Sequence, residues 1–410
     1  MAEHPDSKTM TNLLIHSLLK KGATLVAIGD LTEVPPQIRA DLPYGISIAV
    51  KFPQEVIKGI SQLPTAEYYA HYNRINQKLD RLAQLAAAKL ESLGYKALAQ
   101  TSDYVNNFAG PYSSLLPHKT VATRAGLGFI GKNALLTNQL YGSAIRLTSV
   151  LTDAPLELGQ AINQGQCGDC QLCRQDCPAQ AIKGHLWDTL TNREDLVDVI
   201  ACEKTARARS FLSFGADASI CGKCIEICPY SQEYLNRSPQ QEKAIEEKQL
   251  LQLIENIPSF AEGSIGDYGL WFEELEEHYS PLGINDLTDM DNEEVYSSSY
   301  LISMTPQVKG TDDENFDRVL TEGQDVYFFN IEISEEKPLA CVDFWRYFQS
   351  DGFFTNDLEV SSEPFLTEQK YFLDLFKDFA FKHNLLLLSK EETEIPLENT
   401  TVYKKYFREN

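Results

Sequence analysis

The cysteines constrain this 410-residue chain most, because eight of its nine lie between Cys167 and Cys228. They form two blocks of related spacing. The first block reads Cys167-x2-Cys170-x2-Cys173-x3-Cys177-Pro178, and the second reads Cys221-x2-Cys224-x3-Cys228-Pro229, with Cys202 upstream. Three cysteines two residues apart that lead to a Cys-Pro end are typical of a [4Fe–4S] cluster. Two such blocks predict two clusters and electron transfer.

The blocks also predict which cysteines share a cluster. In two-cluster ferredoxins, the last cysteine of each block ligates the other cluster. Cluster one is therefore expected to use Cys167, Cys170, Cys173 and Cys228. Cluster two is expected to use Cys177, Cys221 and Cys224, and the isolated Cys202 completes its set. Cys341 lies far along the chain, and we expect it to be a buried structural thiol.

Zinc and disulfides are the alternative uses of these cysteines. Zinc sites also contain Cys-x2-Cys pairs, but an interlocked run that ends in Cys-Pro is unusual for them. Disulfides are disfavoured because nothing suggests export: Leu13-Leu14-Ile15 is too short for the apolar core of a signal peptide. No apolar run approaches the roughly 18 residues of a membrane span. We expect a cytoplasmic protein without membrane contact.

Charge divides the chain near residue 238. Residues 1–238 hold 23 Lys and Arg against 22 Asp and Glu, which leaves 13 basic and 37 acidic residues for 239–410. The net charges are therefore +1 and −24, and the segment 236–241 reads as a linker. Because phosphate binding depends on Lys and Arg, the acidity disfavours nucleic acid as a partner.

We expect three domains. Residues 1–160 should form an α/β domain, 161–238 a ferredoxin-type domain with two clusters, and 239–410 an acidic α+β accessory domain of unassigned role. Helices are expected at 11–21, 68–93, 241–257 and 367–383. Strands are expected at 23–28, 45–50, 96–100, 144–151, 295–303, 326–333 and 339–348.

A glycine-rich loop runs from Arg124 to Lys132 and contains Gly126, Gly128 and Gly131. It matches G-x-G-x-x-G, but no strand leads into it and no good helix follows, which disfavours a Rossmann dinucleotide site. Three glycines let the backbone approach a flat or anionic ligand closely, between the positive charges of Arg124 and Lys132. A tight structural turn is the alternative interpretation.

The glycine loop, a following strand and the two cysteine blocks, in this order, resemble the epoxyqueuosine reductases, which are related to reductive dehalogenases. The resemblance covers residues 1–235. It implies that residues 20–160 bind cobalamin, that Gly126, Gly128 and Gly131 line its pocket beside Arg124 and Lys132, and that the clusters supply it with electrons. No D-x-H-x-x-G segment surrounds any of the seven histidines, so such a corrinoid would lack a histidine ligand from that motif.

The resemblance further implies a reductase. It would take electrons from a low-potential donor such as a ferredoxin or flavodoxin, and act on a small molecule or a modified nucleoside. Two departures argue against tRNA as the substrate. Tyr112 stands about where the family has a catalytic Asp, and an acidic segment replaces the family's C-terminal helical repeat.

The reaction needs a proton donor. Tyr112 and His118 are our candidates, ahead of Asp103 and Tyr104. The alternatives are a tyrosine packed at a turn and a histidine bonded to backbone. Two other functions stay open for the whole chain: a two-cluster electron carrier without its own substrate, and a protein that senses a corrinoid or redox state.

Overall fold

The computed structural model describes residues 7–108 and 114–257, and then 283–286, 297–304, 326–334, 337–350, 353–356, 380 and 385–389. The chain forms two compact units, Met1–Gln241 and Glu242–Asn410. Their boundary lies at the end of the segment expected to be a linker. Within the described residues, we find no helix that combines the length and the hydrophobicity needed to cross a membrane.

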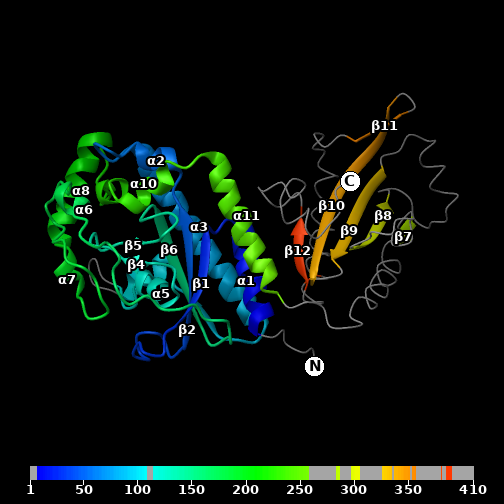
Figure 1. Ribbon diagram of the computed structural model, residues 1–410, viewed down its shortest axis with the longest axis horizontal. Coiled ribbons are helices and arrows are strands. Elements are labelled where there is room, and N and C mark those ends of the chain that lie inside the picture. The colour runs from blue at the N-terminus through cyan, green and yellow to red at the C-terminus, as the bar shows by residue number, and fades with distance from the viewer. Residues whose placement is uncertain are drawn as a thin grey trace. The chain divides into compact units, whose positions relative to one another are not determined.

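A four-stranded sheet organises the first unit (Figure 1). Its strands, in sheet order, are β1 (Leu25–Asp30), β2 (Tyr44–Lys51), β6 (Ile145–Thr152) and β3 (Ala97–Ala99). All neighbours pair antiparallel. The four strands expected for this unit are therefore present, and they make an antiparallel sheet. A loop without a crossover helix joins β1 to β2, and such a connection returns the chain antiparallel.

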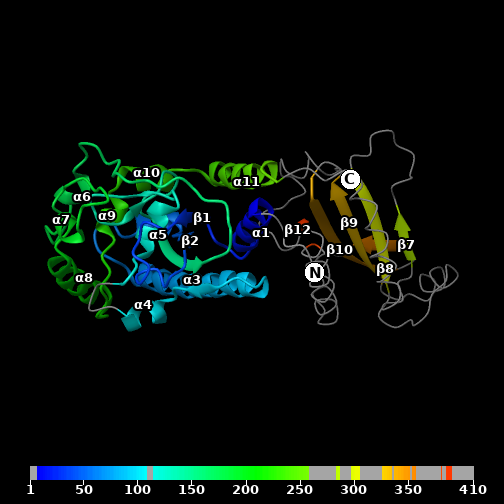
Figure 2. The same ribbon diagram turned by 90° about the horizontal axis from the view of Figure 1, so that it is seen from below.

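Helices cover both faces of this sheet. Alternate β2 residues, Ile46 and Ile48, enter the core formed with α1 (Ser7–Lys20) and α3 (Ala66–Ser92). On the other face, a Cβ at Gly45 would lie 2.7 Å from a side-chain carbon of Val121 in α5 (His118–Arg124). The expected layers of helix and sheet are therefore present (Figure 2).

The long helix α3 has clear start and stop signals. The side chain of its N-cap residue Thr65 accepts a hydrogen bond from the Tyr68 N–H, at 3.1 Å. Leu79, Leu82 and Leu90 are buried at helical spacing. Gly94 follows the helix with φ +83°, a conformation that glycine adopts without strain.

The cysteine-rich segment is part of the same unit. Its helices are α6 (Leu172–Gln175), α7 (Arg193–Leu196), α8 (Val199–Phe214), α9 (Lys223–Glu226) and α10 (Pro229–Leu235). Ile225 and Tyr234 belong to the hydrophobic core that also contains Ile60 and Tyr68. The Tyr234 hydroxyl donates to the Phe52 carbonyl at 2.5 Å. This shared core holds the cysteine loops rigidly against the sheet.

Four short elements complete the described part of the first unit. They are α2 (Gln54–Lys58), α4 (Ser102–Phe108), β4 (Phe129–Ile130) and β5 (Leu136–Thr137). β4 and β5 pair antiparallel within the glycine loop and the residues after it.

The second unit is built on a separate sheet, preceded by α11 (Pro239–Glu255). The strands run in the order β11 (Phe353–Asn356), β10 (Leu339–Ser350), β9 (Val326–Ser334), β8 (Ser297–Met304) and β7 (Gly283–Asp286), and β12 (Leu386–Ser389) pairs with β10. Cys341 on β10 is buried, as predicted. The helix expected at 367–383 lies outside the described residues, except for residue 380.

Candidate functional site

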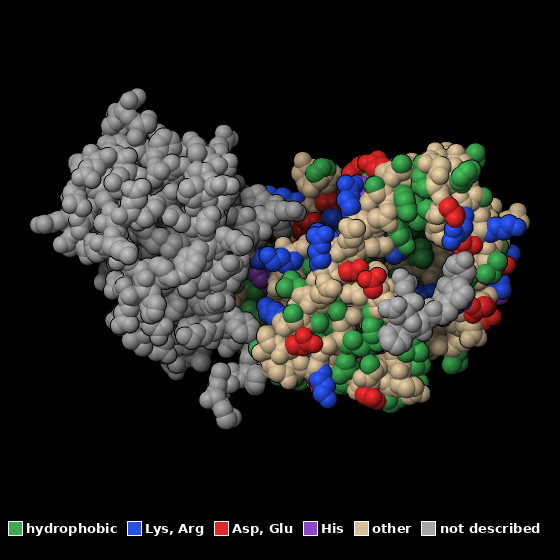
Figure 3. Space-filling model, turned by 180° about the vertical axis from the view of Figure 1, so that it is seen from behind, with side chains coloured by type: hydrophobic (Ala, Val, Ile, Leu, Met, Phe, Trp, Pro, Cys, Tyr) green, Lys and Arg blue, Asp and Glu red, His purple; other side chains and the backbone are tan. Residues whose placement is uncertain are grey.

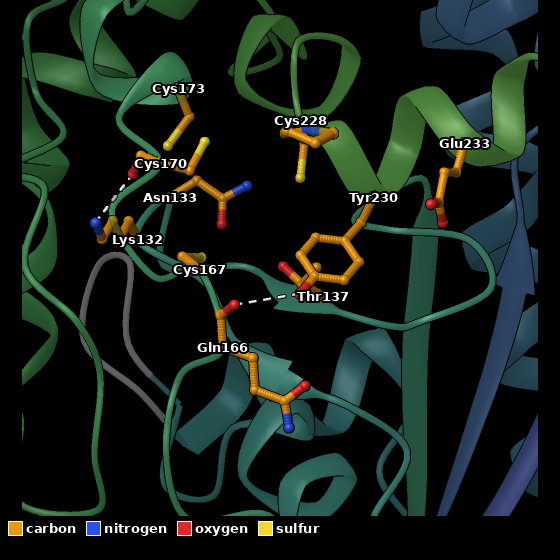
Figure 4. A pocket seen from close by; sticks show the side chains of 11 residues that line it. Lys132, Asn133, Thr137, Gln166, Cys167, Cys170, Cys173, Cys228, Tyr230 and Glu233 are labelled. Carbon is orange, nitrogen blue, oxygen red and sulfur yellow. Dashed lines mark hydrogen bonds between the residues drawn. The ribbon is translucent and has the colours of Figure 1, made fainter.

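Four cysteines line one cavity of about 380 Å³. They are Cys167, Cys170, Cys173 and Cys228. The first three come from the loop that leads into α6 and from α6 itself, and Cys228 is the N-cap residue of α10. Figure 4 shows their side chains arranged around one space. The rest of the wall consists of Lys132, Asn133, Thr137, Gln166, Pro229, Tyr230 and Glu233.

The other four cysteines line a second, smaller cavity of about 50 Å³. They are Cys177, Cys202, Cys221 and Cys224. Cys202 reaches this cavity from the first turns of α8. Much of the remaining wall is apolar, and includes Ala179, Ile182, Val197 and Ala206. The fold thus brings together the same two sets of four cysteines that the spacing in the sequence predicted.

Four cysteines around one cavity are the donor set of a [4Fe–4S] cluster. Among the residues that the structure describes, no group of three or more His, Cys, Asp and Glu side chains is close enough to hold one metal ion. A tetrahedral zinc site needs four donors at about 2.0–2.3 Å from one point. An iron–sulfur cube is larger, so its four thiolates stand farther apart around it. The donor set therefore fits a [4Fe–4S] cube in each cavity.

The pKa values of the thiols reflect the same grouping. Burial raises the pKa of Cys173 to about 11, and the nearby thiols of Cys167, Cys228 and Cys170 add to the rise. Burial likewise raises the pKa of Cys202 to about 11, with Cys177 and Cys221 as its next contributors. Without metal these groups stay protonated at neutral pH, so cluster binding must release protons.

Asn133 lies on the walls of both cavities. Its side-chain amide donates to Ser143 Oγ at 3.3 Å and to the Cys224 carbonyl at 3.4 Å, and its Oδ1 accepts from the Leu135 N–H at 3.1 Å. These contacts fix the side chain between the two cysteine sets. The sequence reasoning missed this residue, although it directly follows the glycine loop.

Lys132, expected to bind a corrinoid, points at the first cysteine loop instead. Its side chain is 4% exposed, and Nζ donates to the carbonyls of Gly168 at 2.7 Å and Cys170 at 2.9 Å. The second of these bonds is visible in Figure 4. The backbone N–H of Lys132 also donates to the Cys167 sulfur. Lys132 thus positions the loop that carries three cysteines.

The three glycines of the loop pack against the chain itself. A Cβ at Gly126 would lie 2.4 Å from the Gln160 carbonyl oxygen, and one at Gly128 would lie 2.5 Å from that of Thr137. At Gly131 a Cβ would lie 2.8 Å from the side chains of Asn133 and Thr137. These contacts explain the glycines as a tight structural turn. Their contact with a corrinoid remains a prediction.

Arg124 points away from the cysteines. Its guanidinium lies 2.8 Å from the Glu33 carboxylate and donates to the Asp30 carbonyl at 3.0 Å. These bonds tie the end of α5 to the end of β1. Corrinoid binding by Arg124, like that by the glycines, remains a prediction.

His118 sits at the start of α5 in a chain of polar groups. Its Nδ1 lies 2.7 Å from Ser149 Oγ, which in turn donates to Gln100 Oε1 at 2.6 Å. Because the Ser149 hydroxyl donates its proton to Gln100, the Nδ1–H of His118 is the donor in the bond to Ser149. Burial, aided by Arg146, lowers the pKa of His118 to about 4. At neutral pH the imidazole is therefore neutral, which is a poor state for a proton donor.

The structure says less about the other candidate proton donors, Tyr112, Asp103 and Tyr104. Tyr112 lies outside the described residues. Asp103 is exposed in the first turn of α4, and the backbone N–H of Tyr104 in the same turn donates to Thr101 Oγ1 at 3.4 Å. Neither residue lines either cysteine cavity.

Comparison with known proteins agrees with the cysteine geometry. Residues 166–231 match the family described as the 4Fe-4S double cluster binding domain. The epoxyqueuosine reductase of Pseudomonas aeruginosa is 30% identical over 114 residues, which are 28% of each chain. That of Synechocystis sp. is 30% identical over 158 residues, 36% of this chain and 50% of that one. That of Staphylococcus aureus is 26% identical over 195 residues, 45% of this chain and 47% of that one.

These relatives confirm the resemblance that the motifs predicted. The matched region nevertheless spans half or less of each of these three relatives. Among solved structures, an epoxyqueuosine reductase with a tRNA-Tyr epoxyqueuosine-modified stem loop aligns over 58% of this chain and 69% of its own, with 19% identity and a TM-score of 0.39. A catabolic reductive dehalogenase with 3-bromo-4-hydroxybenzoic acid aligns over 57% and 35%, with 20% identity and a TM-score of 0.41. Alignments this loose carry no argument of their own.

Proposed function

We propose that this chain is an iron–sulfur oxidoreductase of the epoxyqueuosine reductase type, in which two [4Fe–4S] clusters deliver electrons to a bound corrinoid. The observation that carries the proposal is the sorting of eight cysteines into two sets of four around separate cavities that share Asn133. Each cluster supplies a group that accepts and releases one electron at a time.

The chain's own residues fix the relation between the two cluster sites. Lys132 ties the first cysteine loop to the glycine turn through two carbonyls. Asn133 bonds to the carbonyl of Cys224 in the second set. Since the adjacent residues Lys132 and Asn133 contact both sets, this turn links the two cluster sites.

The corrinoid rests on the similarity to epoxyqueuosine reductases. The residues singled out for the corrinoid make contacts within the chain: a Cβ at Gly126 or Gly128 would meet backbone carbonyls, and Lys132 and Arg124 bind backbone and carboxylate groups. We therefore derive no step through this cofactor. Figure 3 shows a hollow in the first unit, with hydrophobic side chains in its visible wall, where we would look for it.

The expectation against nucleic acid is not supported. The curated relatives are named epoxyqueuosine reductases, after a modified nucleoside. The acidic residues that motivated the expectation lie in 239–410, whereas residues 1–238 have a net charge of +1. We propose a modified nucleoside, alone or in RNA, as the first substrate to test, ahead of a small organic molecule. A ferredoxin or flavodoxin remains our proposed electron donor.

Anaerobic reconstitution with iron and sulfide tests the cofactors. We expect about eight irons per chain, the sum of two cubes, and paramagnetic signals on reduction. Added hydroxocobalamin should remain bound through gel filtration and show a corrinoid absorption spectrum. Zinc in place of iron would overturn the proposal. Eight irons with no retained corrinoid would favour the two-cluster electron carrier.

A further inference from the structure

We infer that Lys132 makes cluster one the electron-collecting end of the pair, by holding its reduction potential above that of cluster two. The inference rests on the proposed function, since it requires both clusters. It assigns a direction to the internal transfer: one electron leaves cluster two and one enters cluster one, and no bond is made or broken.

The first observation is the charge state around Lys132. Its ammonium is buried, and its two hydrogen-bond acceptors are carbonyls that carry no net charge. Glu233, the carboxylate on the wall of the same cavity, is exposed. Water and salt screen an exposed charge far more than a buried one. Asp169, which lies between the two residues whose carbonyls Lys132 contacts, is exposed as well. Of these charges, that of Lys132 is the buried one and acts most strongly at cluster one.

The second observation is the charge state at cluster two. Lys223 lies on the wall of that cavity, directly before Cys224. Its ammonium lies 2.8 Å from the Glu226 carboxylate and 3.7 Å from that of Asp176. These two carboxylates offset the lysine. Cluster two therefore has no comparable positive field.

The third observation is hydrogen bonding to sulfur. The backbone N–H of Lys132 donates to the Cys167 sulfur, and those of Tyr230 and Ser231 donate to the Cys228 sulfur. In the second set, the Cys177 sulfur accepts from the Ala181 N–H at 3.4 Å, an ordinary N–H···S distance. N–H donors spread the negative charge of a cluster, and so favour its reduced form.

The two charge observations act in the same direction, and the hydrogen bonds to the sulfurs of the first set act with them. Reduction adds a negative charge to a cluster that is already anionic. A buried cation and N–H donors stabilise that charge, whereas the apolar wall around cluster two disfavours it. The electron is therefore more stable on cluster one, which opens on the larger cavity. Asn133, on both walls, lies between donor and acceptor.

The test is a redox titration of the anaerobically reconstituted full-length protein, followed by electron paramagnetic resonance. Wild type should show two steps. Lys132→Gln removes the charge but keeps an amide donor, and should lower the upper step by about 59 mV, which is a tenfold fall in the ratio of reduced to oxidised cluster one at fixed potential. Lys132→Arg should leave it in place. Lys223→Gln, the matched control, should leave the upper step unmoved.

Cys202→Ala tests the order of potentials even if Lys132→Gln fails to hold cluster one. It removes a ligand of cluster two, so the surviving [4Fe–4S] signal belongs to cluster one and should titrate at the upper wild-type step. Titration at the lower step, or an unmoved upper step in Lys132→Gln with both clusters present, would overturn the inference. Both results leave the two-cluster oxidoreductase intact, whereas missing iron would refute that proposal itself.

Discussion

Two glycines at the same place in the two cysteine blocks provide a matched test of the site. Gly168 follows Cys167, and Gly222 follows Cys221. Both have positive φ, +51° and +77° respectively. Their surroundings differ: a Cβ at Gly168 would meet nothing within 4 Å, whereas a Cβ at Gly222 would lie 2.2 Å from Ile60 Cδ1 and 3.3 Å from the Tyr68 ring.

The two alanine variants should therefore differ in cost. An alanine in the left-handed region costs roughly 1–2 kcal/mol, and both variants carry this cost. Gly222→Ala also overpacks a site whose neighbours cannot retreat, because Ile60 is fully buried and Tyr68 is 3% exposed. Overpacking adds about 1–3 kcal/mol. Since 1.4 kcal/mol is a factor of ten, the native loop of Gly222→Ala should be roughly 5- to 150-fold less populated than that of Gly168→Ala.

Iron content after anaerobic reconstitution measures the difference. Gly168→Ala should keep about eight irons, whereas Gly222→Ala should keep about four, because it loses cluster two alone. Ile60→Val removes the clashing Cδ1 at a cost of about 0.5–1.5 kcal/mol, so the double variant Gly222→Ala with Ile60→Val should regain iron. Equal iron in the two alanine variants would show that the packing of Gly222 does not govern the second site.

Three further predictions concern Cys202, His118 and the first unit by itself. Cys202→Ala should lower the iron content from about eight to about four, and unchanged content would show that another group completes cluster two. Because the pKa of His118 falls from 6.5 to about 4 on folding, stability should decrease as pH falls from 6.5 to 4, by up to roughly 3 kcal/mol. In urea unfolding at a series of pH values, His118→Gln should lose less over this range, and equal losses would contradict the assigned pKa. A fragment of residues 1–241 contains the whole core of the first unit. It should fold and bind about eight irons, and an insoluble or iron-free fragment would refute its independence.

The sequence alone could predict α1, α3 and the four sheet strands of the first unit, but it did not predict α5 or α8. The helical stripe of α3 and the apolar runs of β1, β2 and β6 depend on local periodicity, which a single chain displays directly. The antiparallel pairing of the sheet did not follow from it. Strand direction depends on which connections cross the sheet. The link from β1 to β2 is a loop without a crossover helix, and the order of strands and helices along the chain does not show this.

The cysteine sets were also predictable, because short spacings limit which thiols can reach one cube. The roles of the glycine loop were not. Whether Gly126 and Gly128 face a ligand or their own chain depends on Gln160 and Thr137, whose carbonyls meet them only after folding.

Lys132 also illustrates what the sequence could predict and what only the fold determined. Its position at the end of the glycine loop was enough to predict that it is a functional cation. Only the fold placed its ammonium beside the carbonyls of Gly168 and Cys170, which carry no net charge. The fold also placed two carboxylates beside the ammonium of Lys223. Spacing along the chain thus determined what the cysteines can bind. Contacts between distant segments decided the electrostatic environment of each set, because a charge acts through space and not along the sequence.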